Sequence, residues 1–283
     1  MRFRRLRAEP PTPAGLLRDA SGRRSLDSDG YVVIDLLDQD QVGDLLVARA
    51  ALGSTPGDPR SGLFNDTFSS EPMYKRQVEA AVAPIMTSAL GMHLDGFRMV
   101  GCVFIAKWPG EAGRVVPHQD ASFVDEGRFH SFMCWCPLVD TQVTGGTLEV
   151  IPGSHRYRRG TRAHQDPTNA FADLDADDVP WRALSMRVGQ AVLYDHALIH
   201  RSGANTGSDV RLALGAPLIP SAATLMYALL AEEDAEVFAI DEAFFLDHQL
   251  DRLDLAAVRR EYRSLGRRRV AGHLDRRAVV ARG

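Results

Sequence analysis

The order of apolar and polar positions predicts two helices followed by a series of strands. Residues 31–37 form an apolar, β-branched run that predicts a strand. Asp38 then stands at the N-cap position of a predicted helix. The apolar residues that recur in that helix at helical spacing are Val42, Leu45, Leu46 and Ala50. A second helix is predicted over residues 71–90, and Pro84 inside it predicts a kink or an end. Its apolar stripe consists of Val78, Val82, Ile85 and Met86.

Short apolar runs separated by Gly, Pro, Asn and Asp dominate the chain after residue 95. They are FRMVGCVFIAKW, RFHSFMCWCPLVD, GTLEVIPGSH, QAVLYDHALIHRS and RLALGAPLIP. Such runs are typical of an antiparallel sandwich or barrel. The sequence therefore predicts a single domain over residues 26–283, with a β core at about 95–220 and a helical tail at about 241–283. Residues 1–25, rich in Arg and Pro, are expected to form a disordered or loosely attached arm.

Composition excludes some partners. The net charge of -4 gives no footprint for nucleic acid, and no apolar run approaches the roughly 18 residues that span a bilayer. The three cysteines include Cys134 and Cys136, a C-x-C pair that is read as two small apolar residues on one face of a strand. So few cysteines, without a disulfide framework, favour a reducing compartment, and we expect a cytoplasmic protein. Nothing in the sequence indicates the oligomeric state.

Candidate metal ligands occur in the stretch VPHQDASF. In a strand, His118 and Asp120 would share one face while Gln119 points away. An imidazole and a carboxylate on one face are two-thirds of a site for a divalent metal. The third ligand is sought in LYDHALIHRSG, where His196 and His200 fall on the same face of an unbroken strand. Spacing alone does not choose between them, and it leaves Asp195 as a rival carboxylate.

The residues after His200 favour this histidine as the third ligand. In HRSGANTGSDVR, Ser202 lies on the same strand face as His200, and hairpin pairing would bring Arg211 beside the metal face. An arginine there offers a rigid fork to a carboxylate. Two histidines and one carboxylate beside open metal positions form the facial triad of non-haem Fe(II) oxygenases. The pattern therefore predicts a metal site that also binds an anionic co-substrate.

These motifs resemble the phytanoyl-CoA dioxygenase family of Fe(II)/2-oxoglutarate oxygenases over about residues 26–220. The stretches that carry the resemblance are SDGYVVIDLLDQDQV, FIAKWPG, PHQD, GGTLEVIPGSH and HRSGANTGSDVR. Gly145 stands where asparagine is common in the family. The resemblance implies a mainly β fold with flanking helices, a double-stranded β-helix (jelly roll, cupin-like). It also implies three cofactors or co-substrates: Fe(II), 2-oxoglutarate and O2.

The resemblance further implies roles for single residues. His118, Asp120 and His200 would be the iron ligands. Arg211 and Ser202 would hold the distal carboxylate of 2-oxoglutarate. The positions expected to line the rest of the co-substrate pocket are Gln119, Trp135 and Lys107. Trp135 fits this role independently, because it shares a strand face with Met133, opposite Cys134 and Cys136.

The implied reaction is hydroxylation of an unactivated carbon of a small molecule, in specialised metabolism for example, with release of succinate and CO2. Asp120 favours hydroxylation over halogenation, because halogenating relatives replace this carboxylate. Desaturation, cyclisation and epimerisation are alternative outcomes of the same chemistry.

Other classes of function remain open. A cupin-like hydrolase or isomerase with zinc or nickel would leave Arg211 without a co-substrate, and a metal-free binding protein would need a damaged triad. The basic loop that contains Arg156, Arg158, Arg159 and Arg162 is read as a solvated face, or alternatively as a contact for an acidic substrate.

Overall fold

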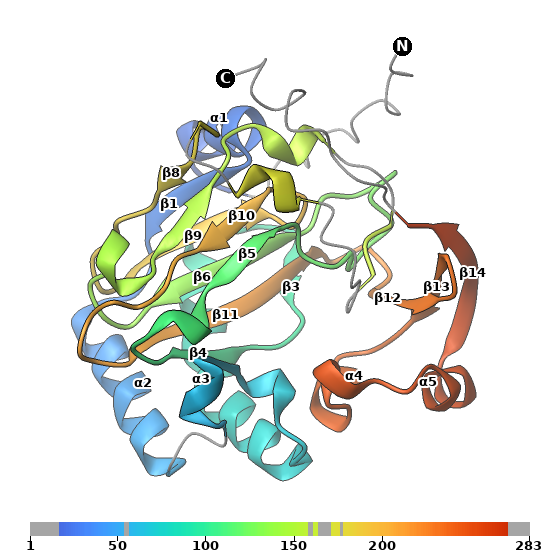
Figure 1. Ribbon diagram of the computed structural model, residues 1–283, viewed down its shortest axis with the longest axis horizontal. Coiled ribbons are helices and arrows are strands. Elements are labelled where there is room, and N and C mark those ends of the chain that lie inside the picture. Colours follow the sequence, from blue (N-terminus) through green and yellow to red (C-terminus); the bar gives the residue numbers. More distant parts are fainter. Residues whose placement is uncertain (1–16, 54–56, 158–160, 164–170, 176–177, 271–283) are drawn as a thin grey trace.

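Two antiparallel sheets form the core of the protein. The computed structural model describes residues 17–53, 57–157, 161–163, 171–175 and 178–270. The larger sheet has seven strands, and Figure 1 shows them crossing the centre of the molecule. In spatial order they are β1 (Tyr31–Asp35), β9 (Gln190–Asp195), β6 (Phe132–Pro137), β11 (Arg211–Pro220), β4 (Val103–Lys107) and β2 (Leu63–Asn65), with β3 (Phe97–Met99) also paired to β11.

A four-stranded sheet lies against one face of the larger sheet. Its strands, in order, are β5 (Val115–His118), β10 (His200–Ser202), β7 (Leu148–Val150) and β8 (Arg182–Ala183). One apolar cluster joins the two sheets: Trp135, Val192 and Tyr194 from the larger sheet pack with Leu148 and Val150 from the smaller. Two sheets packed in this way, with strands that alternate between them, make a jelly roll, the fold that the family resemblance implied.

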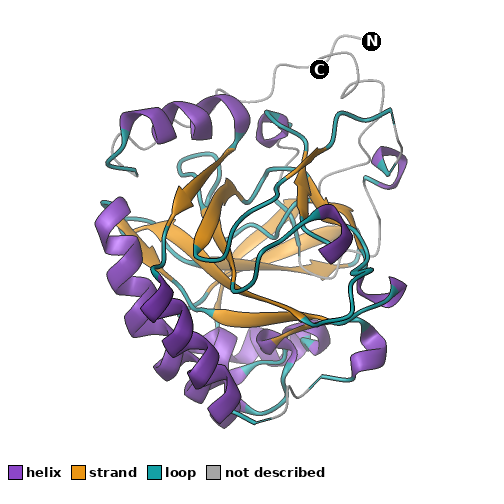
Figure 2. Ribbon diagram, turned by 90° about the vertical axis from the view of Figure 1, so that its left-hand side faces the viewer, coloured by secondary structure: helices purple, strands orange, loops and turns teal. Residues whose placement is uncertain are grey.

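Helices cover the opposite face of the larger sheet (Figure 2). Asp38 and Gln41 form a capping box at the start of α2 (Gln39–Ala51), which confirms the predicted helix start. Val42 and Leu45 of α2 are buried as expected, whereas Leu46 is 40% exposed. Helix α3 (Pro72–His93) runs through Pro84 without ending there. Cys134 and Cys136 pack on this helical side, and Trp135 lies in the cluster between the sheets.

Several predicted boundaries are wrong. Helix α1 (Ala20–Asp29) lies within the expected N-terminal arm, and residues 1–16 of that arm lie outside the described residues. The β structure also extends beyond 95–220: β1 confirms the strand predicted at residues 31–37, β2 follows it, and a third sheet lies after residue 220. The third sheet consists of β12 (Met226–Ala231), β13 (Asp234–Ala239) and β14 (Arg263–Arg269).

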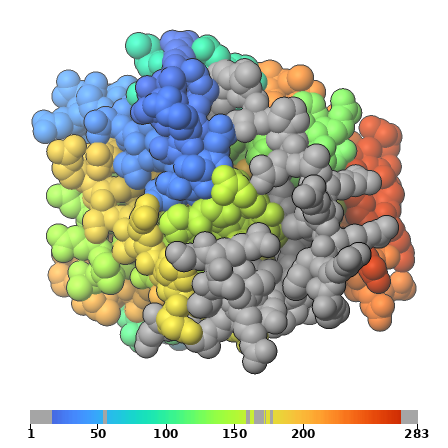
Figure 3. Space-filling model, turned by 90° about the horizontal axis from the view of Figure 1, so that it is seen from above, coloured from blue at the N-terminus to red at the C-terminus, as the bar shows by residue number. Residues whose placement is uncertain are grey.

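The expected helical tail is only partly helical. It contains α4 (Ala243–Asp247) and α5 (Leu255–Glu261), but Arg263–Arg269 forms β14, because the segment pairs antiparallel with β13. Tertiary pairing here overrides the helical tendency of an arginine-rich sequence. Figure 3 shows this C-terminal segment, in red, at the edge of the molecule away from the blue N-terminal helices.

Short 3₁₀ turns complete the fold, and no helix in the described ranges is long and apolar enough to cross a membrane. The turns are η1 (Pro59–Ser61), η2 (Asp66–Phe68), η3 (Glu111–Gly113), η4 (Val143–Gly145), η5 (Ser154–Arg156), η6 (Ala172–Leu174) and η7 (Leu250–Arg252).

Candidate metal centre and co-substrate pocket

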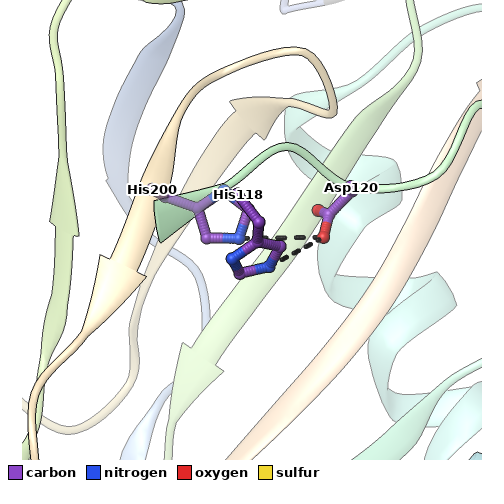
Figure 4. A group of neighbouring side chains, drawn as sticks. All are labelled: His118, Asp120 and His200. Atoms are coloured by element: carbon purple, nitrogen blue, oxygen red, sulfur yellow. Dashed lines mark ion pairs between the residues drawn. The ribbon is translucent and has the colours of Figure 1, made fainter. Parts of the chain in front are cut away.

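Three side chains converge between the sheets. His118 ends β5 and His200 begins β10, and these two residues are directly paired across the strands. Asp120 follows β5, and its Oδ1 lies 3.7 Å from Nε2 of each histidine. Ligand atoms of the three residues all lie within 4.8 Å of one another, and Figure 4 shows the two rings and the carboxylate turned toward one point. The arrangement can hold one divalent ion on three neighbouring positions.

Backbone carbonyls orient both imidazoles for this role. Nδ1 of His118 donates to the carbonyl of Val116 at 2.9 Å, and Nδ1 of His200 donates to the carbonyl of Leu198 at 3.0 Å. Each Nε2 is therefore left with its lone pair toward Asp120. Burial, together with His118, lowers the pKa of His200 to about 4, so this ring is neutral. The second oxygen of Asp120, Oδ2, is buried without a hydrogen-bond partner in the described chain. A cation fits this donor set.

The rival ligands have other partners. Asp195 accepts a hydrogen bond from Nδ1 of His130 at 2.7 Å and another from the amide of Ala197 at 2.8 Å. Nδ1 of His196 lies 2.8 Å from the hydroxyl of Ser131, and its ring stacks on Phe123. Neither residue belongs to the metal-binding group.

Sequence reasoning missed Tyr194. Its hydroxyl lies 3.4 Å from Nε2 of His200. Burial raises the pKa of Tyr194 well above its usual value, so the phenol stays protonated and donates. The available signal was position: Tyr194 precedes His196 by two residues in a strand, and so shares its predicted face.

Two buried cations lie beside this centre. Lys107 at the end of β4 and Arg211 at the start of β11 are directly opposite each other in the ladder, an arrangement that is destabilising for like charges. Lys107 is 0% exposed and Arg211 is 5% exposed. Burial, and then Arg211, lower the pKa of Lys107 to about 7. Burial lowers the pKa of Arg211 to about 10.

The hydrogen bonds of these cations go to neutral oxygens and do not balance their charges. Lys107 donates to the hydroxyl of Ser202 and, at 2.7 Å, to the carbonyl of Gly203. Arg211 donates to the carbonyl of Gly146 at 2.5 Å, and its Nε is buried without a partner in the described residues. Within those residues neither cation forms a salt bridge. A carboxylate fits this pair of cations.

The structure places the other predicted pocket residues as follows. Trp135 lies under Arg211, with the guanidinium carbon 5.0 Å from the ring centroid. Gln119 donates to the carbonyl of Ala197 at 2.5 Å, which ties the metal loop to the segment before β10. The predicted hairpin between Ser202 and Arg211 is wrong. After Ser202 the chain crosses from the smaller sheet to the larger one. Lys107 links the two residues instead, because it lies opposite Arg211 in the ladder and its ammonium donates to the Ser202 hydroxyl.

The interpretation of the basic loop as a solvated face is wrong for Arg162, which is 7% exposed. Its Nε donates to the carbonyl of Asp120 at 2.5 Å, and its other nitrogens pair with Glu126. Arg162 therefore braces the loop that carries a candidate metal ligand. Arg156 is exposed, and Arg158 and Arg159 lie outside the described residues.

A cavity of about 170 Å³ opens beside Asp120, between the larger sheet, α3 and α4. Its lining is mostly apolar and includes Met133, Pro217, Phe123, Tyr227 and Phe245. A cavity of roughly this size holds a molecule such as benzene. The metal-binding group thus shares Asp120 with an apolar cavity, and it shares strand β10 with the two buried cations.

Comparison with known proteins agrees with this geometry. The family model for phytanoyl-CoA dioxygenase (PhyH) matches residues 26–213. Phytanoyl-CoA dioxygenase domain-containing protein 1 of Danio rerio is 30% identical over 149 residues, which are 50% of each chain. Phytanoyl-CoA dioxygenase of Arabidopsis thaliana is 29% identical over 154 residues, 53% of this chain and 54% of that one. The chain thus spans about half the length of the curated relatives it matches.

Solved structures share the fold. HygX from Streptomyces hygroscopicus, with nickel and 2-oxoglutarate bound, superimposes with a TM-score of 0.54 at 15% identity, over 73% of this chain and 88% of that one. The 2-oxoglutarate-dependent carbocyclase SnoK from nogalamycin biosynthesis gives a TM-score of 0.51 at 21% identity, over 77% and 89%. By its sequence match over residues 26–213, the chain belongs to the phytanoyl-CoA dioxygenase (PhyH) family.

Proposed function

We propose that the protein is an Fe(II)- and 2-oxoglutarate-dependent dioxygenase that hydroxylates an unactivated carbon of a small molecule and releases succinate and CO2. One observation carries the proposal: β10 contributes His200 to the metal-binding group and Ser202 to the buried Lys107–Arg211 pair. Two residues along a strand span about 6.6 Å. A dicarboxylate of five carbons can therefore reach from the metal to the two cations.

The protein residues have separate tasks in this proposal. His118, Asp120 and His200 hold the ferrous ion, which supplies the dioxygen chemistry when bound. Lys107, Arg211 and Ser202 hold the distal carboxylate of 2-oxoglutarate, with Trp135 as one wall. Lys107 and Arg211 are buried, so their charges have lost the stabilisation of water. The negative charge of the co-substrate offsets this desolvation cost. The apolar cavity beside Asp120 positions the substrate carbon and excludes water from it.

The alternatives have less support. A zinc or nickel hydrolase or isomerase would use the three ligands but would leave two neighbouring buried cations without a purpose. Desaturation, cyclisation and epimerisation differ from hydroxylation only in the later steps, which depend on the substrate. A cytoplasmic location is part of the proposal, since all three cysteines are free and buried.

Anaerobic titration tests the proposal directly. Adding Fe(II) and 2-oxoglutarate should produce the weak visible charge-transfer band of the chelate, and air should then convert 2-oxoglutarate to succinate. His200→Ala should lose both signals. His93→Ala, at the end of α3, is the matched control and should keep them. Wild-type protein that gives neither band nor succinate would refute the assignment.

A further inference from the structure

The basic residues of the chain are almost all arginines. Among its 33 Lys and Arg residues only two are lysines, Lys75 and Lys107. Both are buried, with exposures of 4% and 0%. Lys107 lies in the candidate co-substrate pocket, whereas Lys75 lines the apolar cavity beside Asp120. Burying an ammonium group is unfavourable unless it is paired, so each lysine needs a reason in function or in structure.

Contacts within the described residues leave the charge of Lys75 largely unpaired. Its Nζ donates to the carbonyl of His248 at 2.6 Å, which uses one of its three donors. The carboxylate of Asp247 favours the charged form of Lys75, but it forms its own salt bridge with Arg76 at 2.7 Å. Lys75 also lies in the first turn of α3, where the helix dipole disfavours a cation. Burial lowers the pKa of Lys75 to about 8.

The acidic residues of the same cavity do not pair with Lys75 either. Asp66 accepts hydrogen bonds from the Tyr74 hydroxyl at 2.8 Å and from the Phe104 amide at 2.7 Å. Glu242 forms a salt bridge with Arg98. Glu79 lies one turn after Lys75 on α3, and no salt bridge joins the two in the described part of the chain.

We propose that Lys75 binds the carboxylate of the substrate, and that the substrate is a small acid with an apolar body about the size of one aromatic ring. The inference rests on the proposed function, because it assigns a substrate class to the same active site. Phe123, Tyr227 and Phe245 form an aromatic cluster that lines the cavity and contacts the apolar body. The ammonium of Lys75 orients the acid so that its apolar part lies beside Asp120.

The two lysines allow a test that observes each pocket separately. Labelling lysine with ¹³C at Cε gives two side-chain NMR signals, and Lys75→Met and Lys107→Met each remove one, which assigns them. Zn²⁺, which has a filled d shell, replaces iron, and 2-oxoglutarate is added first to fill its pocket. The probes are phenylacetate, cyclohexanecarboxylate and hexanoate, each compared with its own amide.

The acids should shift the Lys75 signal and bind at least tenfold more tightly than their amides, because an amide leaves the ammonium unpaired. Lys75→Met should remove this preference. The proposal is overturned if no acid binds, if acids and amides bind alike, or if the preference survives in Lys75→Met. The wild-type comparison alone decides it, even if the variant folds poorly. A shift of the Lys107 signal by 2-oxoglutarate tests the proposed function independently.

Discussion

Replacing Lys107 with methionine should stabilise the protein in the absence of 2-oxoglutarate. Burial and Arg211 lower the pKa of Lys107 from 10.5 to about 7. At about 1.4 kcal/mol per pH unit, the charged ammonium costs about 5 kcal/mol in the folded state. Methionine removes that cost but leaves the Ser202 hydroxyl and the Gly203 carbonyl without their donor, a loss of about 1 kcal/mol each. The net gain below pH 7 is therefore about 3 kcal/mol.

The stability difference between Lys107→Met and wild type should change with pH. Between pH 7 and 10.5 the folded state binds fewer protons at Lys107 than the unfolded state, so wild-type stability falls as the pH decreases through this window. The full penalty is present below pH 7 and disappears near pH 10.5. The advantage of Lys107→Met should thus shrink as the pH rises from 7, and near pH 10 the variant should be less stable by about 1 kcal/mol.

Urea unfolding between pH 6.5 and 10 measures the difference in free energy of unfolding between wild type and Lys107→Met. All other titrating groups are common to both proteins. Ser202→Ala is the matched control, since it removes one acceptor and keeps the cation. It should lose about 1 kcal/mol and retain the wild-type pH dependence. In wild type, 2-oxoglutarate should add stability by mass action, and in Lys107→Met it should add much less. A variant less stable than wild type at pH 7, or a difference that does not change with pH, would refute the reasoning.

Three further changes test the site. His200→Ala should lower the affinity for Fe(II) about 100-fold or more, as measured by anaerobic titration, and unchanged affinity would remove this residue from the ligand set. Gly146→Ala should destabilise the protein by about 1–3 kcal/mol and weaken 2-oxoglutarate binding, because Gly146 has φ +62° and a Cβ there would lie 2.6 Å from a backbone oxygen. Gly145→Ala is the control: a Cβ there meets nothing within 4 Å, so thermal unfolding and binding should stay unchanged. Arg162→Met should weaken Fe(II) binding about tenfold by loosening the loop after His118; equal metal affinity in calorimetry would contradict that role.

Local patterns predicted the parts of the structure that depend on neighbouring residues. The capping box at Asp38 and the opposite faces of Trp135 and Cys134 follow from spacing alone. These two features need only neighbouring residues. The convergence of His118 with His200 joins distant segments, and it was expected from the family resemblance, because the hairpin that favoured His200 does not form.

Contacts between distant segments could not be predicted in this way. Arg162 reaches Asp120 across 42 residues from a loop whose charges suggest solvent exposure. The arginine-rich segment Arg263–Arg269 becomes a strand only because β13 offers it a partner. The hairpin predicted for Arg211 failed because single-sequence spacing does not reveal that the chain changes sheets after Ser202.

Strand β10 is only three residues long, yet it serves both halves of the site. A shift of its register by a single residue would turn His200 and Ser202 away from the interior at the same time and turn Arg201 inward. One residue inserted or deleted just before His200 should therefore abolish both binding activities in one step, whereas point substitutions can remove them one at a time. In mutational scans of this segment, small insertions should remove metal binding and 2-oxoglutarate binding together, whereas substitutions should remove either one alone.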